Sequence, residues 1–137
     1  MTQSKTLLAA VLLALAFSPI FPAVSSAQIF SDDSYKAESA ILSAGSRAAA
    51  ASRLRTIPGV GVVNLAFRNT PRFRSDVPDV SEFRISAEKN HAGIGKLRSA
   101  LRANPATRAA MARHGISVNR VVGVDIYSDG SIRFYTL

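Results

Sequence analysis

The chain has 137 residues, of which 17 are basic and 9 are acidic, so its formal net charge is +8, and it contains no cysteine. The missing cysteines exclude disulfide bonds, a cysteine nucleophile and cysteine metal ligands. The charge favours anionic partners, and it bears on association rather than on the fold.

The first 27 residues have the organisation of a secretory signal peptide. Met1–Lys5 supplies a short positive region, Leu7–Phe17 is an uninterrupted apolar stretch, and small residues lead up to Ala27, where we expect cleavage. A retained membrane anchor is the alternative, but it needs roughly 20 continuous apolar residues, and prolines follow the apolar stretch. We therefore predict that residues 1–27 are removed and that the mature chain has no transmembrane span.

Cleavage leaves residues 28–137, a length that suits one compact domain. Export predicts a periplasmic or secreted location. The abundant anions there are lipopolysaccharide, anionic lipids and acidic glycans. The net charge therefore makes an anionic envelope component one candidate partner, an envelope protein is the other candidate, and export argues against nucleic acid.

The first half of the domain predicts a helix followed by a strand. A polar residue at positions 32–34 can cap a helix over Tyr35–Leu54, although Gly45 weakens its continuity. Pro58 ends the helical region, because a proline disfavours the helical conformation of the residue before it. Val60–Phe67 then has the pattern of a strand with apolar residues on both faces, which predicts a strand that is covered on both sides.

The next segment, Arg68–Pro78, is a predicted loop with arginines around Phe73. An aromatic ring among arginines suits stacking on a sugar or a lipid head group. We take Arg68, Arg72 and Arg74 as candidate anion-binding residues. The alternative is an ordinary solvated connection in which Phe73 packs back onto the core.

Two further helices are predicted before the C-terminal strands. Val80–Ala103 has apolar residues at helical spacing, although residues 80–86 could instead form a short strand. Asn104 suits an N-terminal cap and the proline after it suits the first helical position, so a second helix is expected over Pro105–His114. Gly115 suits the position that closes this helix.

The last residues, Asn119–Leu137, predict a β-hairpin around Asp129–Gly130, because runs rich in β-branched and aromatic residues flank that dipeptide. A two-residue turn would create a core face and a second face. The core face would carry Val122, Val124, Ile126, Tyr135 and Leu137. The second face would carry Asp125 and Thr136 beside Val121, Tyr127, Ile132 and Phe134. We take Tyr127, Ile132 and Phe134 as an apolar patch and a candidate partner surface. A three-residue loop with a bulge is the alternative, and it would shift the register by one residue.

Residues with catalytic or metal-binding potential are few. His91 and His114 lie far apart, and neither a metal-binding spacing nor a complete phosphate-loop motif is present. We therefore expect no enzymatic activity, no metal and no cofactor. Asp125 is the most unusual acid, because strands disfavour aspartate. It should pair with an arginine if its face is buried, and it should keep that face soluble if it is exposed.

The predicted order of elements indicates an α+β fold, in which a small antiparallel sheet ends in the C-terminal β-hairpin and about three helices pack on it. These features favour an exported binding or protein-interaction module that uses the hairpin patch. The alternative is a cationic envelope-associated protein that binds anionic lipid, lipopolysaccharide or glycan. In that case Arg98 and Arg102, on one side of a predicted helix, would act together with the loop arginines.

Two stretches carry a resemblance to a known group of proteins: the VVNL strand and the run LRSALRANPATRAAMARHGISVNRVVGVDIYSDGSIRFYTL. They are similar to small exported proteins of alphaproteobacteria that have no assigned function. The resemblance covers most of the mature chain. It implies export and a compact domain, and it brings no activity, ligand or site residue.

Overall fold

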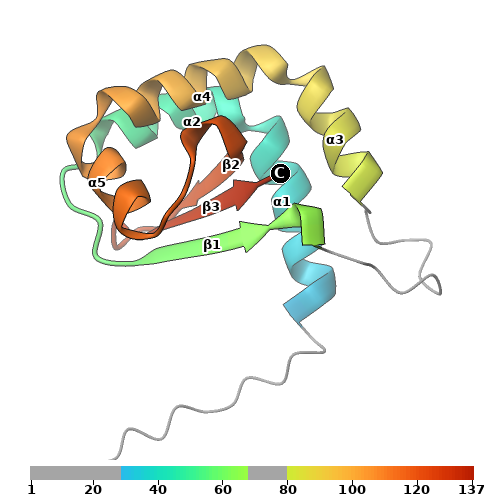
Figure 1. Ribbon diagram of the computed structural model, residues 1–137, viewed down its shortest axis with the longest axis horizontal. Coiled ribbons are helices and arrows are strands. Elements are labelled where there is room, and N and C mark those ends of the chain that lie inside the picture. The colour runs from blue at the N-terminus through green and yellow to red at the C-terminus, as the bar shows by residue number, and fades with distance from the viewer. Residues whose placement is uncertain (1–28, 68–79) are drawn as a thin grey trace, which may run out of the picture.

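The structure is a computed structural model that describes residues 29–67 and 80–137 (Figure 1). Within these residues the fold is α+β, with five α-helices and one three-stranded sheet. The predicted signal peptide lies outside the described residues. In chain order the elements are α1 (Ile29–Leu42), α2 (Ala44–Arg53), β1 (Val60–Asn64), the 3-10 helix η1 (Leu65–Phe67), α3 (Val80–Lys89), α4 (His91–Ala103), α5 (Pro105–Arg113), the 3-10 helix η2 (Val118–Arg120), β2 (Val121–Ile126) and β3 (Ile132–Thr136).

Both long predicted helices are interrupted, which is why the fold has more helices than expected. The first is interrupted at Ser43, between α1 and α2, and the second at Asn90, between α3 and α4. The two interruptions meet, because the Asn90 side-chain amide donates to the carbonyl oxygens of Ile41 and Leu42 at 2.7 and 3.0 Å. Carbonyl groups in the last turn of a helix need a donor from outside that helix. Asn90 therefore closes the end of α1 while it separates α3 from α4.

The start of α3 decides between the two predictions for residues 80–86, which belong to a helix and not to a strand. The predicted helix after it is confirmed as α5. Asn104 caps α5, because the Ala106 N–H donates to Asn104 Oδ1 at 2.8 Å. Gly115 follows the last turn with a φ of 62°, a conformation that suits glycine.

Small residues bring α2 and α4 together, and the two helices lie side by side (Figure 1). A Cβ atom on Gly45 of α2 would lie 3.1 Å from the Cα atom of Gly93 of α4. The two glycines thus lack the side chains that would hold the helices apart. The same glycines lower the helix propensity of the sequence, so close packing outweighs propensity at this contact.

The sheet has the strand order β1-β3-β2, and it is mixed rather than antiparallel. Strands β2 and β3 form the predicted antiparallel hairpin, whereas β1 pairs with β3 in parallel. The chain leaves β1, forms α3, α4, α5 and β2, and returns as β3 between the other two strands. Parallel pairing needs a long connection of this kind. The expectation of an antiparallel sheet is confirmed for β2 and β3 and is wrong for β1, because the pattern of a single strand does not reveal its neighbour.

The hairpin closes with the three-residue loop and not with the favoured two-residue turn. The Tyr127 N–H donates to the Ser131 carbonyl at 2.9 Å, and the Gly130 N–H donates to the Tyr127 carbonyl at 3.0 Å. Gly130 has a φ of 86°, which glycine adopts without strain. The Asp129 carboxylate accepts from the Ser131 N–H and hydroxyl, both at 2.9 Å, and these bonds lower the pKa of Asp129. Together they hold the loop that shifts the register.

The shifted register changes which hairpin residues are buried. Ile132 pairs with Ile126 and Phe134 pairs with Val124, so these apolar residues share one face. Ile132 is 1% exposed and Phe134 is 0% exposed. The expectation that both lie on an exposed patch is therefore wrong.

Both faces of the middle strand are covered. Phe134 and Tyr135 are fully buried, although consecutive strand residues point to opposite faces. The outer strand β1 differs, because Val62 is 46% exposed. The prediction that β1 is covered on both sides is wrong at this residue.

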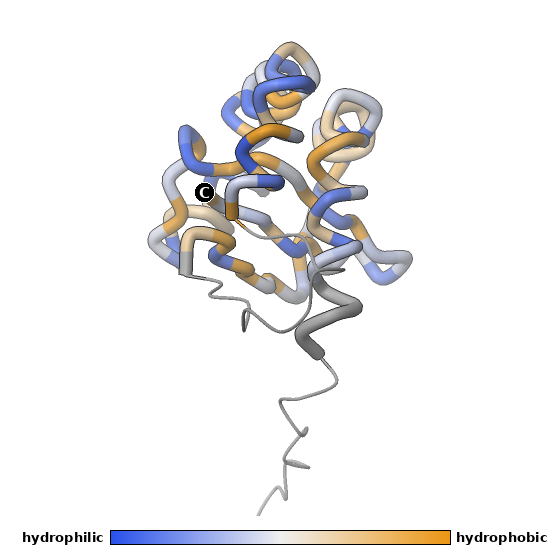
Figure 2. Tube along the Cα trace, turned by 90° about the vertical axis from the view of Figure 1, so that its right-hand side faces the viewer, coloured by the Kyte–Doolittle hydropathy of each residue, from blue (hydrophilic) through white to orange (hydrophobic). Residues whose placement is uncertain are grey.

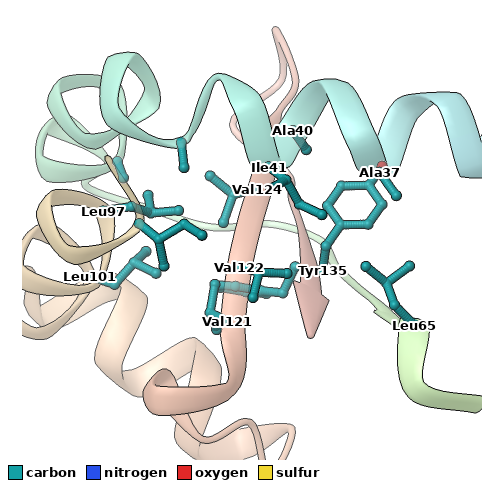
Figure 3. Packing of buried hydrophobic residues seen from close by; sticks show 14 of the residues in the cluster. Ala37, Ala40, Ile41, Leu65, Leu97, Leu101, Val121, Val122, Val124 and Tyr135 are labelled. Carbon is teal, nitrogen blue, oxygen red and sulfur yellow. The ribbon is translucent and has the colours of Figure 1, made fainter. Parts of the chain in front are cut away.

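The core joins the helices to the sheet (Figure 3). The ring of Tyr135 points toward Ala37 and Ile41 of α1, while Leu97 and Leu101 of α4 lie on the other side of the β2 ribbon in this view. Figure 2 shows hydrophilic and hydrophobic segments that follow each other at short intervals along the helices. This is the pattern of helices that bury one apolar face and keep a polar face outside.

Candidate functional site

Only one residue of the predicted partner surface lies at the surface. Tyr127 is 43% exposed, and the guanidinium carbon of Arg133 lies 5.6 Å from the centre of its ring, which is a cation–π distance. Ile132 and Phe134 belong to the core instead. The structure therefore does not bring these residues together as an apolar patch.

The predicted anion-binding residues Arg68, Arg72 and Arg74 lie outside the described residues. Their role stays a prediction. The described part of the chain has its own concentration of positive charge, which involves other residues and is built from helices.

The aspartate in the middle of β2 is partly buried and has defined partners. The Tyr135 hydroxyl donates to Asp125 Oδ2 at 2.7 Å, and Arg47 Nη2 lies 4.0 Å from Asp125 Oδ1. Its cross-strand neighbour is Arg133. The predicted arginine partner is present, but the shorter contact comes from a tyrosine that the two-residue turn would place on the opposite face.

This contact has the properties of a structural link. Burial raises the pKa of Tyr135, and the hydrogen bond and charge of Asp125 raise it further, whereas Arg133 acts in the opposite direction. The hydroxyl therefore stays protonated at physiological pH and keeps donating to the carboxylate. The contact ties β3 to β2, and Arg47 extends it to α2.

We expect Tyr135→Phe to lower the free energy of unfolding by about 1.5 kcal/mol, because it removes a hydrogen bond to a carboxylate and keeps the ring. Urea denaturation followed by circular dichroism measures the change. Tyr127→Phe removes a hydroxyl from an exposed ring, and this control should stay within about 0.5 kcal/mol of the wild type. Equal losses in the two variants would contradict the assigned role of the Tyr135–Asp125 bond.

The histidines take no part in a cluster of metal-binding groups. Across residues 29–67 and 80–137, no three His, Asp or Glu side chains are placed to hold one metal ion. His91 begins α4, His114 follows α5, and both are exposed. The feature that remains to be explained is the distribution of charge.

Basic and acidic residues are segregated in this chain. Residues 44–55 contain α2, residues 89–120 contain α4, α5 and η2, and these segments hold three and seven basic residues but no acidic residue. We call the two segments the basic layer. They adjoin in space, because α2 packs on α4 and α4 packs on α5. Its basic residues are Arg47, Arg53, Arg55, Lys89, Lys96, Arg98, Arg102, Arg108, Arg113 and Arg120.

Some arginines of the basic layer are bound to the protein itself. Arg98 Nε donates to the Val121 carbonyl at 2.8 Å, and Arg102 Nη2 donates to Asn119 Oδ1 at 2.6 Å. Burial, followed by the charge of Arg102, lowers the pKa of Arg98. The predicted pair thus lies on α4 as expected, but both side chains hold the segment that enters β2.

Other cations of the basic layer have no such attachment. Arg53, Arg55, Lys96 and Arg108 are exposed. Among the described residues, their side chains have no hydrogen bond and no ion pair. These four positive charges are therefore available to a partner.

An open depression of about 780 Å³ lies at the corner where α2 ends and α5 begins, lined by residues 52–55 and 103–106. Arg53 and Arg55 both line it. Asn104 fixes the corner, because its amide donates to the carbonyls of Ala51 and Leu54, both at 2.8 Å, while its Oδ1 caps α5. The depression therefore has two arginines on a well-fixed backbone.

The absence of acidic residues from the two segments can be read in the sequence. The contact between the two segments cannot be read there, because residues 44–55 and 89–120 are separated by a strand, a predicted loop and α3. The signal that could have found this layer is the long interval without Asp or Glu between Glu88 and Asp125.

Comparisons with protein family models, with curated proteins and with solved structures found no match for this chain. Among the described residues, no helix is both long enough and apolar enough to cross a membrane. What the protein binds is therefore inferred from the charge and geometry of its own residues.

Proposed function

We propose that this protein is an exported binding module that uses its basic layer to hold an extended anionic partner of the cell envelope, such as anionic lipid, lipopolysaccharide or acidic glycan. The segregation of charge carries this proposal, because residues 44–55 and 89–120 include many basic residues and no acidic one. The predicted signal peptide is the reason for seeking the partner outside the cytoplasm.

Charges of one sign that are gathered without counter-charges repel each other and weaken the folded state. An anionic surface or polymer removes this repulsion and attracts several cations at once. Each exposed ion pair contributes at most about 1 kcal/mol, so useful affinity needs many contacts. An extended partner supplies them, and a small monovalent anion does not.

The hairpin patch gives no support to a protein-interaction function, because Ile132 and Phe134 are buried. We propose binding rather than catalysis, without a cofactor. Arg68, Arg72 and Arg74 remain candidate members of the same anion-binding surface, because they would add charge of the same sign.

The test is binding of the protein without its predicted signal peptide to heparin and to phosphatidylcholine vesicles with and without anionic lipid. Lys96→Gln combined with Arg108→Gln removes two exposed charges from the basic layer, and we expect about fivefold weaker binding to both anions. The matched control, Lys36→Gln combined with Arg84→Gln, removes the same charge from α1 and α3. It should weaken binding less.

Equal losses in the two double variants would contradict the basic layer as the binding surface. No binding of the wild type to heparin or to anionic vesicles would contradict the function itself. A triple variant, in which Arg68, Arg72 and Arg74 are each changed to Ala, measures separately whether the predicted loop belongs to the surface.

A further inference from the structure

The depression at the α2–α5 corner differs from the other basic positions, because two arginines line one hollow. Arg53 and Arg55 both contribute to its wall, and no acidic residue does. Neither side chain has an ion pair or a hydrogen bond to any described residue. Arg98 and Arg102, in contrast, donate to the protein itself. The guanidinium N–H groups of both arginines can therefore donate to a ligand.

The end of α2 places the two arginines. Arg53 is the last residue of α2, and Leu54 leaves the helix in an extended conformation, with a φ of −63° and a ψ of 124°. Arg53 and Arg55 are therefore only two residues apart at the end of α2. An anion that contacts both side chains would offset the repulsion between their like charges. A ligand with two negative charges would balance them.

The side chain of Asn104 holds the backbone around the depression in place. Asn104 is 7% exposed, and its side chain joins the end of α2 to the start of α5 through Ala51, Leu54 and Ala106. A site whose backbone is fixed in advance loses less entropy when it binds. The two arginine side chains are exposed and would be ordered by the ligand.

We propose that this corner binds a phosphate monoester group, with Arg53 and Arg55 as the residues that contact it. This inference rests on the proposed function, since the group would belong to the anionic partner of the basic layer. Planar guanidinium groups match phosphate oxygens with paired hydrogen bonds. A monoester carries up to two negative charges at neutral pH, which suits two arginines. The depression is open, so the group can be carried by a larger molecule.

A phosphate monoester can come from a small solute or from a lipid head group, and two experiments distinguish these sources. In the first, inorganic phosphate is titrated into isotopically labelled protein at constant ionic strength, and the amide NMR signals of Leu54, Arg55 and Ala106 are followed. In the second, binding to phosphatidylcholine vesicles with phosphatidic acid, a monoester, is compared with binding to vesicles of equal surface charge that contain phosphatidylglycerol, a diester.

We expect saturable shifts confined to the corner, a preference for phosphatidic acid, or both. Shifts without a lipid preference assign the site to a solute, and a lipid preference assigns it to a head group. Arg53→Gln combined with Arg55→Gln should weaken the saturable binding about tenfold. The matched control, Lys36→Gln combined with Arg84→Gln, removes the same charge from α1 and α3, outside both the depression and the basic layer, and should keep the saturable binding. Equal urea midpoints would show that all variants fold alike.

Shifts that spread over the whole basic layer, or equal losses in the two double variants, would overturn the corner site. So would the absence of both a corner shift and a lipid preference. These outcomes leave the proposed function intact if heparin and anionic vesicles still bind. If neither of them binds, the proposed function fails, and the phosphate titration still decides whether the corner is a site.

Discussion

Gly123→Val should lower the free energy of unfolding by about 3 kcal/mol or more. A Cβ atom at Gly123 would lie 2.7 Å from the carbonyl carbon and 2.9 Å from the carbonyl oxygen of Ala40. These are backbone atoms of α1, so they cannot turn away as the end of a side chain can. The helix would have to move off β2, and its contacts between Ile41 and Tyr135 would loosen (Figure 3). Urea denaturation measures the loss.

The control is Gly95→Ala in α4, where a Cβ atom would meet no other atom within 4 Å. Alanine favours a helix over glycine by up to about 1 kcal/mol, so this variant should be as stable as the wild type or more stable. A Gly123→Val protein with wild-type stability would show that α1 does not lie against β2 as closely as the structure has it.

Asn104→Ala should cost about 3 kcal/mol, because one buried side chain serves both ends of the α2–α5 corner. The substitution removes the N-terminal cap of α5 and leaves the carbonyls of Ala51 and Leu54 without their donor. Losing a helix cap costs about 1 kcal/mol, and each buried carbonyl without a partner adds to that. Thermal and urea denaturation both report the change.

Asn104→Ser separates the two parts of this effect. Serine can still cap α5 but is too short to replace the amide that donates to α2. The free energy of unfolding of this variant should therefore lie between those of the wild type and Asn104→Ala. If Asn104→Ser were as stable as the wild type, the bonds to Ala51 and Leu54 would contribute nothing, and the corner would not be held by Asn104.

Local signals in the sequence predicted the elements well, and long-range contacts account for most of the errors. The cap at Asn104 and the closing Gly115 act within one turn of α5, so residue type alone indicates them. The interruption at Asn90 depends on carbonyl groups of α1 that are far away in the chain. The parallel pairing of β1 likewise depends on where the chain returns, which no single strand reveals.

The hairpin shows how one residue in a loop changes a predicted surface. Asp129–Gly130 correctly marks the position of the turn, but two-residue and three-residue loops both use an Asp-Gly pair. The bonds from Ser131 to Asp129 accompany the longer loop. The one-residue shift then moves Ile132 and Phe134 into the core. The basic layer is hidden from the sequence for a different reason, since it exists only where α2, α4 and α5 meet.

The salt dependence of heparin binding tests the central claim most directly. If the basic layer binds anionic partners, the affinity of the wild type should fall steadily as sodium chloride is raised from low to physiological concentration, because salt screens exposed charges. Lys96→Gln combined with Arg108→Gln should show a shallower dependence, because fewer charges are paired. An affinity that does not change with salt, or a dependence that is the same in this variant, would contradict the claim.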